Sequence, residues 1–500
     1  MPWVGPQLAA FGTVARASDE LLTESLLPLA TAAQGLSVDS LKPTNGRINV
    51  GALGDLAAPA DQAADRAVAA ASELRGVDRT PLLGKVGTAV EQADQMFSGV
   101  SAAVDGVART AELLPAMLGQ DGPRNYLVLV QNNSEWRSLG GITGTAILLH
   151  TDQGSVSLKD TQSATGLVRD LQEPIMELPN DVVDIYGTRP ARYFHNLTQI
   201  PDFTLDGPIA REMYRSKTGV NVDGVIAVDP VVLSYLLGAT GPVMLPAGDR
   251  ISAENAVPFL LNDVYLRYAE PSAQDAVFAG AAGAVFQGLL DGHGSVSDIV
   301  KALGRAGSEH RLLLWSADEQ EQARIADTSI AGKLPLTDTT TARFGVFLND
   351  GTGSKMSYYV RPDVSLEWRS CQSFEPVDRR SLTLRVTLTN TAPANAGATL
   401  PDYITGGGAY GTVPGDAKVV ANLFLPTGSG LAYAESTDGS TFEDGQFEGR
   451  QVLTFGVELS PGESTSIEVR VSPPATTEDA EAVVTPTADA TLAPFVRSSC

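Results

Sequence analysis

The sequence predicts a multidomain chain with an N-terminal α-helical stalk, a central α/β domain and a C-terminal immunoglobulin-like β-sandwich. Three changes of pattern indicate this order: apolar residues at heptad spacing near the start, short apolar runs between helical stretches in the middle, and period-two alternation near the end. The predicted domains are 1–120, 121–335 and 336–500. Three domains also agree with a length of 500 residues, of which 43% are hydrophobic and 19% charged, as is typical of globular proteins.

The first 120 residues contain three helical patterns. A leucine stripe spans 21–29, and a second helix is predicted over 59–75, after Pro59. The clearest helix covers 86–118, where apolar residues recur at alternating spacings of four and three. This seam is typical of an antiparallel bundle or a coiled stalk, although amphipathic helices packed on the next domain would also show it. Neither arrangement carries chemistry.

An α/β pattern begins at 121–123. Short apolar runs over 126–130, 145–150 and 154–158 predict buried strands, with a hairpin turn at 152–154. The elements predicted further along are helices around 205–218, 230–237, 253–268 and 273–290 and a strand over 222–228. Strands interleaved with helices predict a sheet covered by helices.

Strands of an antiparallel sandwich are predicted after about residue 340. Polar and apolar residues alternate over 364–368, 381–388 and 464–471, and Gly, Pro and Asn turns separate these runs. The tail 473–490 is rich in Pro, Thr, Ala and acidic residues, and we expect it to be an extended segment.

The sequence contains two cysteines, Cys371 and Cys500. We expect them to form a disulfide that ties down the C-terminus, which would indicate an oxidising compartment; the alternative is two unrelated thiols. Because the sequence has no Cys-x-x-C motif and no Cys/His cluster, it does not predict a structural zinc site.

The net charge and the hydropathy pattern limit which partners and which cellular location the sequence predicts. A formal net charge of −24 argues against nucleic acid as a partner, because phosphate binding needs a basic face. The sequence contains no run of about 18 apolar residues, so it does not predict a membrane span. Since a helical pattern starts directly after Met1-Pro2-Trp3-Val4, we expect a membrane anchor N-terminal to this sequence and an extracytoplasmic location in the cell envelope.

Polar residues and a glycine pair follow the first predicted strand of the middle domain. This tract, 131–141, contains Glu135 and Arg137. Ligands of α/β domains bind at such strand ends, so the tract is a candidate site. A turn with a surface arginine is the alternative.

Aspartates supply further candidates. Asp202 can cap a helix, and Asp229 before Pro230 fits an N-cap followed by proline at the first helical position. Asp263 and Arg267 lie four residues apart on one predicted helix face. This spacing predicts either a helix ion pair or a phosphate-facing arginine beside an acid.

Several stretches resemble the bacterial envelope proteins grouped as domain of unknown function 4012. In order and character the resemblance covers about 121–360. The stretches that carry it are YLVLVQNNSEWRSLGG, QIPDF, VDGVIAVDPVVLSYLLGATGPV, AENAVPFLLNDVYLRY and LNDGTGSKMSYYV. This family has no established activity that the resemblance could imply.

The order of elements is also similar, more distantly, to the LytR–CpsA–Psr phosphotransferases, which attach glycopolymers from polyprenyl-pyrophosphate carriers to the cell wall. This resemblance implies that Arg137 and Arg267 hold the pyrophosphate and that Asp160 holds Mg²⁺, so these three are the candidate catalytic residues. Arginine forks bind phosphate bidentately, and Mg²⁺ offsets charge during phosphoryl transfer. The candidate binding residues are Glu135, Asp202, Asp223 and Asp263.

Three tracts differ from the phosphotransferase pattern. The usual Arg-x-Asp-Thr tract is replaced at 138–141, the Pro-Arg-Asp tract at 158–161, and the arginine cluster after the Tyr-x-Arg helix at 272–275. These differences bear on catalysis, whereas the likeness of the fold can survive them.

Three functions follow as hypotheses. The leading one is a membrane-anchored envelope protein whose central domain binds, and if active transfers, a wall glycan or a polyprenyl-linked glycan. The second is a non-catalytic scaffold that binds wall polymer. The third is a glycoside hydrolase that uses two carboxylates such as Asp202 and Asp223.

Overall fold

The computed structural model describes residues 3–34, 42–44, 46–168, 170–334, 340–369, 381–474, 476–477, 479–489 and 495–499. The chain divides into two compact units, and each is described by itself. The first unit contains the N-terminal helices together with 150–157 and 289–297. The second contains the remainder of the chain from residue 125 onward.

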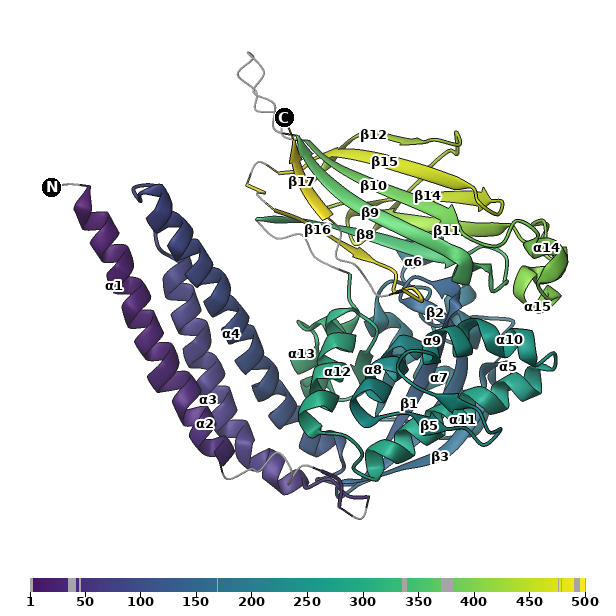
Figure 1. Ribbon diagram of the computed structural model, residues 1–500, viewed down its shortest axis with the longest axis horizontal. Helices are drawn as coiled ribbons and strands as arrows, with labels where there is room; N and C mark the ends of the chain where they lie inside the picture. Colours follow the sequence, from purple (N-terminus) through teal and green to yellow (C-terminus); the bar gives the residue numbers. More distant parts are fainter. Residues whose placement is uncertain are drawn as a thin grey trace. The chain divides into compact units, whose positions relative to one another are not determined.

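The first unit is built on long helices (Figure 1). Its described elements are α1 (Val4–Glu20), a π-helical continuation (Leu21–Leu26), α2 (Leu27–Gln34), α3 (Val50–Arg75) and α4 (Gly84–Met117). The buried residues of α4 recur every seven positions, as the predicted heptad seam requires: Val90, Phe97, Val104 and Ala111. Phe97 and Val104 share a core with a row of alanines on α3 between Ala60 and Ala71, whose small side chains let the helices approach closely.

Helix α3 begins earlier than the sequence pattern predicted. It starts at Val50, and the side chain of Asn49 caps it by accepting a hydrogen bond from the backbone N–H of Ala52 at 3.2 Å. Pro59 therefore lies inside the helix, and the predicted start after Pro59 was wrong. A helix of 26 residues that buries a whole face can tolerate the one backbone hydrogen bond that proline removes.

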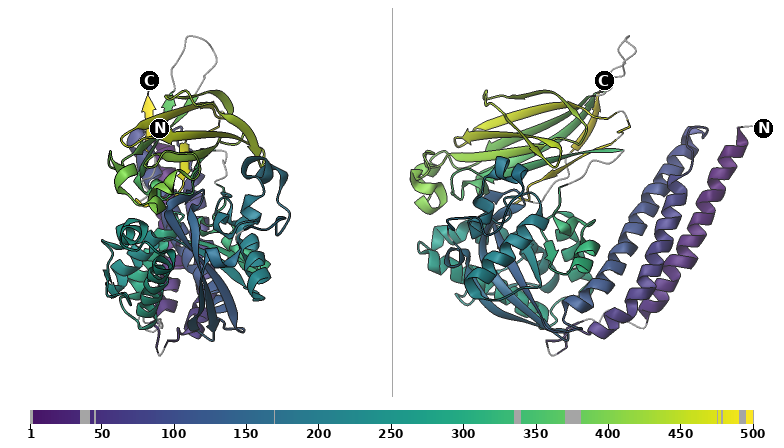
Figure 2. Two further views of the ribbon diagram at one scale, coloured as in Figure 1. Left: turned by 90° about the vertical axis from the view of Figure 1, so that its right-hand side faces the viewer. Right: turned by 180° about the vertical axis from the view of Figure 1, so that it is seen from behind.

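The second unit contains a five-stranded sheet with the order β3-β2-β1-β4-β7. Figure 2 shows helices on both faces of this sheet, which confirms the α/β character of the middle region. Its strands are β1 (Arg124–Arg137), β2 (Gly140–Asp152), β3 (Ser155–Ser163), β4 (Gly224–Val228) and β7 (Leu313–Ser316). Strand β1 pairs with β4 in parallel, and β4 pairs with β7 antiparallel.

Strand β1 is much longer than the predicted strand 126–130. It runs on through the polar tract to Arg137, and β2 begins at Gly140. The expectation that the tract 131–141 follows the strand as a loop was therefore wrong. Hydrophobic periodicity ends the strand too early because the second half of β1 buries polar side chains whose partners come from distant parts of the sequence.

The hairpin turn between β2 and β3 lies where it was predicted. Gln153 and Gly154 both have positive φ, 49° and 78°, as a type I′ turn requires. A Cβ on Gly154 would also lie 2.1 Å from the carbonyl oxygen of Ile48, so only glycine fits this position.

The helices of this region largely follow the predictions. Those expected at 205–218, 230–237 and 273–290 are α7 (Phe203–Thr218), α8 (Pro230–Thr240) and α11 (Pro271–Leu290). The one expected over 253–268 is divided into α9 (Ala256–Pro258), a π-helical turn (Phe259–Asp263) and α10 (Val264–Arg267). The other short elements are α5 (Ala164–Leu167), α6 (Asn180–Tyr186), the 3-10 turns Arg189–Ala191, Phe194–Asn196 and Ser329–Ala331, β5 (Val243–Met244), β6 (Arg250–Ile251), α12 (Val296–Ser308) and α13 (Glu319–Ile325).

The C-terminal region is rich in strands, which form two five-stranded sheets with the orders β12-β15-β10-β9-β17 and β13-β14-β11-β8-β16. The strands are β8 (Thr341–Asp350), β9 (Val360–Arg369), β10 (Ser381–Asn390), β11 (Ala417–Phe424), β12 (Gly430–Ser436), β13 (Glu443–Phe447), β14 (Arg450–Leu459), β15 (Ser464–Ser472), β16 (Asp479–Val484) and β17 (Phe495–Ser499). Short helical elements lie at Met356–Tyr359, α14 (Ala396–Thr399), α15 (Asp402–Thr405) and Gly406–Gly408. Part of the predicted extended tail is therefore a strand, since β16 pairs in parallel with β8.

Two expectations concern features that the structure does not report in full. Cys371 and Cys500 lie outside the described residues, so their predicted disulfide stays a prediction. Within the described ranges, every helix is too short or too polar to cross a membrane.

Candidate functional site

The second half of β1 places charged side chains in the protein interior. Glu135 and Arg137 flank Trp136, which is fully buried. The backbone N–H of Trp136 faces the hydroxyl of Ser357, and the N–H of Ser138 donates to the side chain of Asn349 at 3.1 Å. The end of β1 is therefore covered by the segment that follows β8, more than two hundred residues along the chain.

Four charged residues meet at this point: Glu135, Arg137, Asp350 and Lys355, called here the charge cluster. The ammonium of Lys355 lies 2.5 Å from one carboxylate oxygen of Glu135, and Arg137 Nη2 lies 3.2 Å from the other. The side chains of these three residues are only 6–11% exposed. Because charges so deeply buried lose their hydration, each depends on its partners to stay ionised.

Mutual attraction decides which groups of the charge cluster are ionised. Burial opposes the charge of Glu135, but Lys355 and Arg137 outweigh it and hold the pKa of Glu135 below its ordinary value. Burial likewise opposes the charge of Lys355, yet Glu135 raises the pKa of Lys355. Burial, followed by repulsion from Glu135, raises the pKa of Asp350 to about 6. Glu135 and Lys355 thus favour each other's charged form.

Tyrosines enclose the amine of Lys355. It lies 6.0 Å from the ring centroid of Tyr265 and 5.8 Å from that of Tyr403, and the two rings stack at 5.5 Å. The hydroxyl of Tyr265 accepts a hydrogen bond from the side-chain amide of Asn132 on β1. Tyr403 is 45% exposed, so one face of this enclosure lies at the surface.

The turn that presents Lys355 is organised by Asp350. Its carboxylate accepts hydrogen bonds from the backbone N–H groups of Thr352, at 3.0 Å, and Gly353. The ring of Tyr410 covers the same turn, because a Cβ on Gly353 would lie 3.1 Å from it. Hydrogen bonds to Asp350 therefore define this turn, and Tyr410 packs on it.

The three predicted catalytic residues have separate partners. Arg137 belongs to the charge cluster. Asp160 lies on β3, is exposed, and accepts hydrogen bonds from Gln162 and from the N–H of Thr161. Arg267 is 52% exposed and pairs with Asp249 at 2.9 Å. The interactions seen in the described ranges join none of the three to another.

Of the other predicted residues, Asp202 and Asp223 accept hydrogen bonds from backbone N–H groups, and Asp263 accepts one from a side chain. Asp202 caps α7 by accepting from the N–H of Thr204 at 2.9 Å, and Asp223 accepts from the N–H of Asn125 at 2.8 Å. The ion pair proposed between Asp263 and Arg267 is replaced by the Arg267–Asp249 pair, while Asp263 accepts from the neighbouring side chain of Asn262.

A magnesium site at Asp160 was implied by the phosphotransferase resemblance. Among the described residues, no group of three or more Asp, Glu, His or Cys side chains is arranged to hold a metal ion. Within the part of the chain that the structure describes, the Asp160 carboxylate accepts hydrogen bonds from the side-chain amide of Gln162 and from the N–H of Thr161. Magnesium at Asp160 therefore stays a prediction, and we assign no step to it.

A second buried network surrounds Arg311, whose side chain is fully buried. Arg311 pairs with Asp229 at 2.7 Å and with Glu309 at 3.0 Å. It also donates to the carbonyl oxygens of Thr487, at 2.8 Å, and Asp489, at 2.6 Å, in the segment after β16. Asp229 at the same time caps α8, with Pro230 at its first position, as predicted. One buried arginine thus joins a helix cap to the C-terminal segment.

A buried acid on α7 carries a testable pH dependence. Neither carboxylate oxygen of Asp206 meets the geometry of a hydrogen bond with the residues described. Burial, and then repulsion from Asp202, raise its pKa well above the ordinary 3.8, while the nearby backbone of Thr198 acts in the opposite direction. Because the folded pKa exceeds the unfolded one, this group's stability is fully present below about pH 4 and is lost as the pH rises toward the folded value.

We therefore expect Asp206→Asn to gain stability relative to the native chain as the pH increases. Urea unfolding measured at intervals from pH 4 to pH 8 would give the free energy of unfolding of both chains, and the variant's advantage over the native chain should grow with pH. Asp184→Asn on the exposed face of α6 is the matched control. Parallel curves for the native chain and Asp206→Asn would contradict the assignment.

The sequence identified half of the charge cluster. Glu135 and Arg137 were candidates, whereas Lys355 and Asp350 were missed, although both lie in a stretch that carried the family resemblance. The available signal was the tract Asp-Gly-Thr-Gly-Ser-Lys before the predicted strand 364–368, where a lysine and an acid flank a run of small turn residues. Arg311 carried no comparable signal.

The comparisons with known proteins give a family and little else. Residues 121–265 match the family described as Protein of unknown function (DUF4012). No curated protein matches the chain. Among solved structures, the chain is similar to the protein gbs0355 from Streptococcus agalactiae, with 13% identity over 43% of this chain and 75% of that chain and a TM-score of 0.26. So low a TM-score supports no argument about function.

Proposed function

We propose that this chain, which belongs to the DUF4012 family through its residues 121–265, is a non-catalytic cell-envelope scaffold that binds wall glycan. In this proposal it is extracytoplasmic and membrane-anchored, its α/β domain keeps a LytR–CpsA–Psr-like fold, and its two C-terminal sheets form an immunoglobulin-like sandwich. The proposal differs from a phosphotransferase in one respect: glycan is bound without being transferred.

The observation that carries the proposal is the use of Arg137 inside the protein. Its Nε and Nη2 donate to the side-chain oxygen of Asn196, Nη2 also contacts Glu135, and Nη1 donates to the carbonyl oxygen of Trp136 at 2.8 Å. An arginine that binds pyrophosphate must present free N–H donors to a ligand. Four of the five N–H donors of Arg137 already have protein partners, which favours a structural role over a catalytic one.

Two exposed tyrosines offer a surface for sugar. Tyr403 is 45% and Tyr410 71% exposed, and we call this pair the tyrosine face. The ring of Tyr403 stacks on the ring of Tyr265, and the ring of Tyr410 packs on the turn at Gly353. The C–H face of a sugar ring is apolar and can stack on a rigid aromatic ring at little cost in conformational entropy.

A sedimentation assay with purified wall glycan tests the proposal. We expect the whole chain to bind without releasing sugar or phosphate, and Tyr403→Ala with Tyr410→Ala to reduce the bound fraction at least tenfold. Phe11→Ala is the matched control, because Phe11 is an aromatic residue of similar exposure, 56%, in the helical unit. Equal binding by the double variant and the control would overturn the assignment of the tyrosine face.

A thermal-shift experiment separates binding from phosphotransfer. The phosphotransferase reading predicts that a polyprenyl pyrophosphate with Mg²⁺ raises the melting temperature and that Arg267→Ala abolishes the rise. We expect no such rise. Arg267 is the informative site because it is half-exposed, so replacing it tests ligand binding without opening the core.

A further inference from the structure

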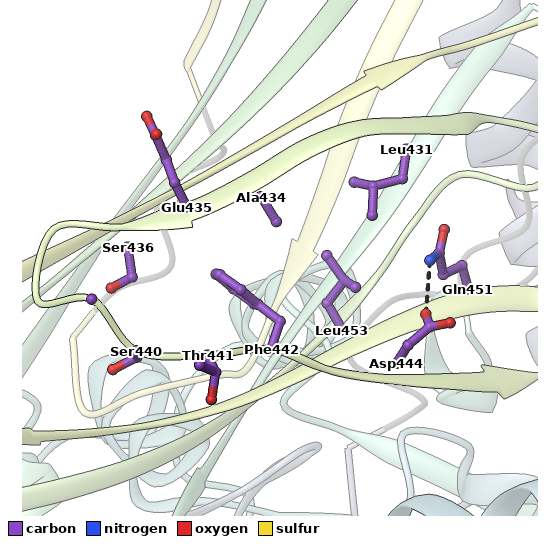
Figure 3. Close-up of a pocket in the computed structure, with 11 residues that line it drawn as sticks. Leu431, Ala434, Glu435, Ser436, Ser440, Thr441, Phe442, Asp444, Gln451 and Leu453 are labelled. Carbon is purple, nitrogen blue, oxygen red and sulfur yellow. Dashed lines mark hydrogen bonds between the residues drawn. The ribbon is translucent and has the colours of Figure 1, made fainter.

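An open pocket of about 760 Å³ lies between β12 and β13, and Figure 3 shows the side chains around it. Each strand ends one of the two C-terminal sheets: in the described sheets β12 pairs with β15 alone, and β13 with β14 alone. The edge of β12 therefore borders the pocket, whereas β13 is contacted by α6: a Cβ on Gly445 would lie 3.4 Å from Ile185, and the N–H of Glu448 donates to Asp181. A strand edge is a template for another strand unless something blocks it.

The pocket has an apolar interior. Leu431 from β12, Phe442 before β13 and Leu453 from β14 lie around its centre (Figure 3). Leu453 is nearly buried, whereas Leu431 is 36% exposed. An occupant that alternates its side chains can bury every second one against these three residues.

The borders of the pocket are acidic. The segment 430–447, which contains both strands, has four acids, Glu435, Asp438, Glu443 and Asp444, and no Lys, Arg or His. Glu435 and Asp444 line the pocket. A second copy of this chain would bring the same acids against these edges, and like charges oppose that pairing. A basic occupant would gain from them.

The size of the edges fits a short segment. Strand β13 has five residues and β12 has seven, which corresponds to roughly 17–23 Å of extended chain. A bulge between Leu431 and Tyr433 interrupts the β12–β15 pairing near the start of β12, while Tyr433–Ser436 pair regularly. The regular part of β12, Tyr433–Ser436, can thus accommodate about four residues.

We propose that the groove between β12 and β13 is a docking site for an extended, basic segment of a partner protein. The segment adds as a strand to the edge of β12, places alternate apolar side chains against Leu431, Phe442 and Leu453, and directs its basic side chains to Glu435 and Asp444. This interaction is separate from glycan binding at the tyrosine face.

A labelled hexapeptide of alternating lysine and valine, titrated into the whole chain and followed by fluorescence anisotropy, tests the site. We expect saturable binding that Glu435→Lys with Asp444→Lys weakens at least tenfold. Glu458→Lys is the control for charge, because Glu458 is an exposed acid on β14 of the same sheet, outside the pocket lining. The tyrosine-face double variant should bind the peptide normally.

Strand addition is distinguished from simple charge attraction by a second peptide. The same sequence with N-methyl groups on alternate residues keeps its charge and loses the backbone donors, so its binding should fall at least tenfold. Undiminished binding of the methylated peptide, or equal binding by the double charge reversal and the Glu458→Lys control, would overturn the proposal. Two further results would also overturn it: self-association of the chain, or saturable binding of a neutral oligosaccharide, if Leu431→Asp abolishes either.

Discussion

Replacing Lys355 with methionine is expected to lower the free energy of unfolding by about 3–5 kcal/mol, the range observed when one partner of a buried ion pair is removed. Lys355→Met leaves the carboxylate of Glu135 in the interior with only Arg137, at 3.2 Å, to compensate it. It also leaves Asp350 beside a negative charge on Glu135 that Lys355 no longer balances. Burial and Glu135 already raise the pKa of Asp350 to about 6.

The expected loss depends on the charge left behind and not on the contact itself. Lys355→Met combined with Glu135→Gln removes both charges at similar volume, and the pair should recover most of the stability lost by Lys355→Met alone. Urea unfolding followed by tryptophan fluorescence is a suitable measurement, because Trp136 is fully buried between the two charged positions of β1.

Lys301→Met is the matched control for this cycle. Lys301 is 74% exposed and pairs with Asp298 across one turn of α12, so its loss should change stability by less than about 1 kcal/mol. The interpretation would be refuted by a Lys355→Met variant that unfolds like the control, or by a double variant no more stable than the single one.

Lys355 also shows which features of the structure cannot be predicted from the sequence. Features set by neighbouring residues were predicted well, such as the Asp229–Pro230 helix start and the turn at Gln153-Gly154. Their physics is local, because a cap or a turn is complete within a few residues. The heptad seam of α4 was predicted for the same reason.

The charge cluster needs contacts that no local pattern contains. Glu135 was identified only as a polar residue near a strand end, and its partner Lys355 lies 220 residues further along the chain. The same separation in sequence explains why the predicted strand 126–130 ended too early. Buried polar residues whose partners are distant in sequence cannot be told from a loop when only apolar residues are counted. Part of the tail was taken for an extended segment because its partner strand, β8, precedes it by more than 130 residues.

The second large effect is expected at Arg311. Arg311→Met should cost about 3–5 kcal/mol, because it leaves the carboxylate of Asp229, 2% exposed, without its cation. Asn133, which donates to Asp229 at 3.1 Å, is a neutral partner and cannot replace that charge. The same substitution removes the donors to the carbonyl oxygens of Thr487 and Asp489.

Loss of these donors should free the C-terminal segment locally, in addition to the global destabilisation. Hydrogen exchange read by mass spectrometry should show faster exchange over 485–489 in Arg311→Met, while β10, in the other sheet, changes only with global stability. Arg311→Lys should recover the charge next to Asp229 but not the fork that reaches both carbonyl oxygens, so it should restore stability in part and leave 485–489 unprotected.

Arg215→Met is the control for the loss of an arginine, since Arg215 is 49% exposed and pairs with Glu212 on the same helix. If Arg311→Lys restored the protection of 485–489 completely, charge alone would hold the segment. If Arg311→Met behaved like Arg215→Met, the buried arginine would not couple the helix cap at Asp229 to the end of the chain. The predicted order of stability, native first, then Arg311→Lys, then Arg311→Met, follows because only the guanidinium has enough donors in a fixed fork to reach a carboxylate and two carbonyl oxygens.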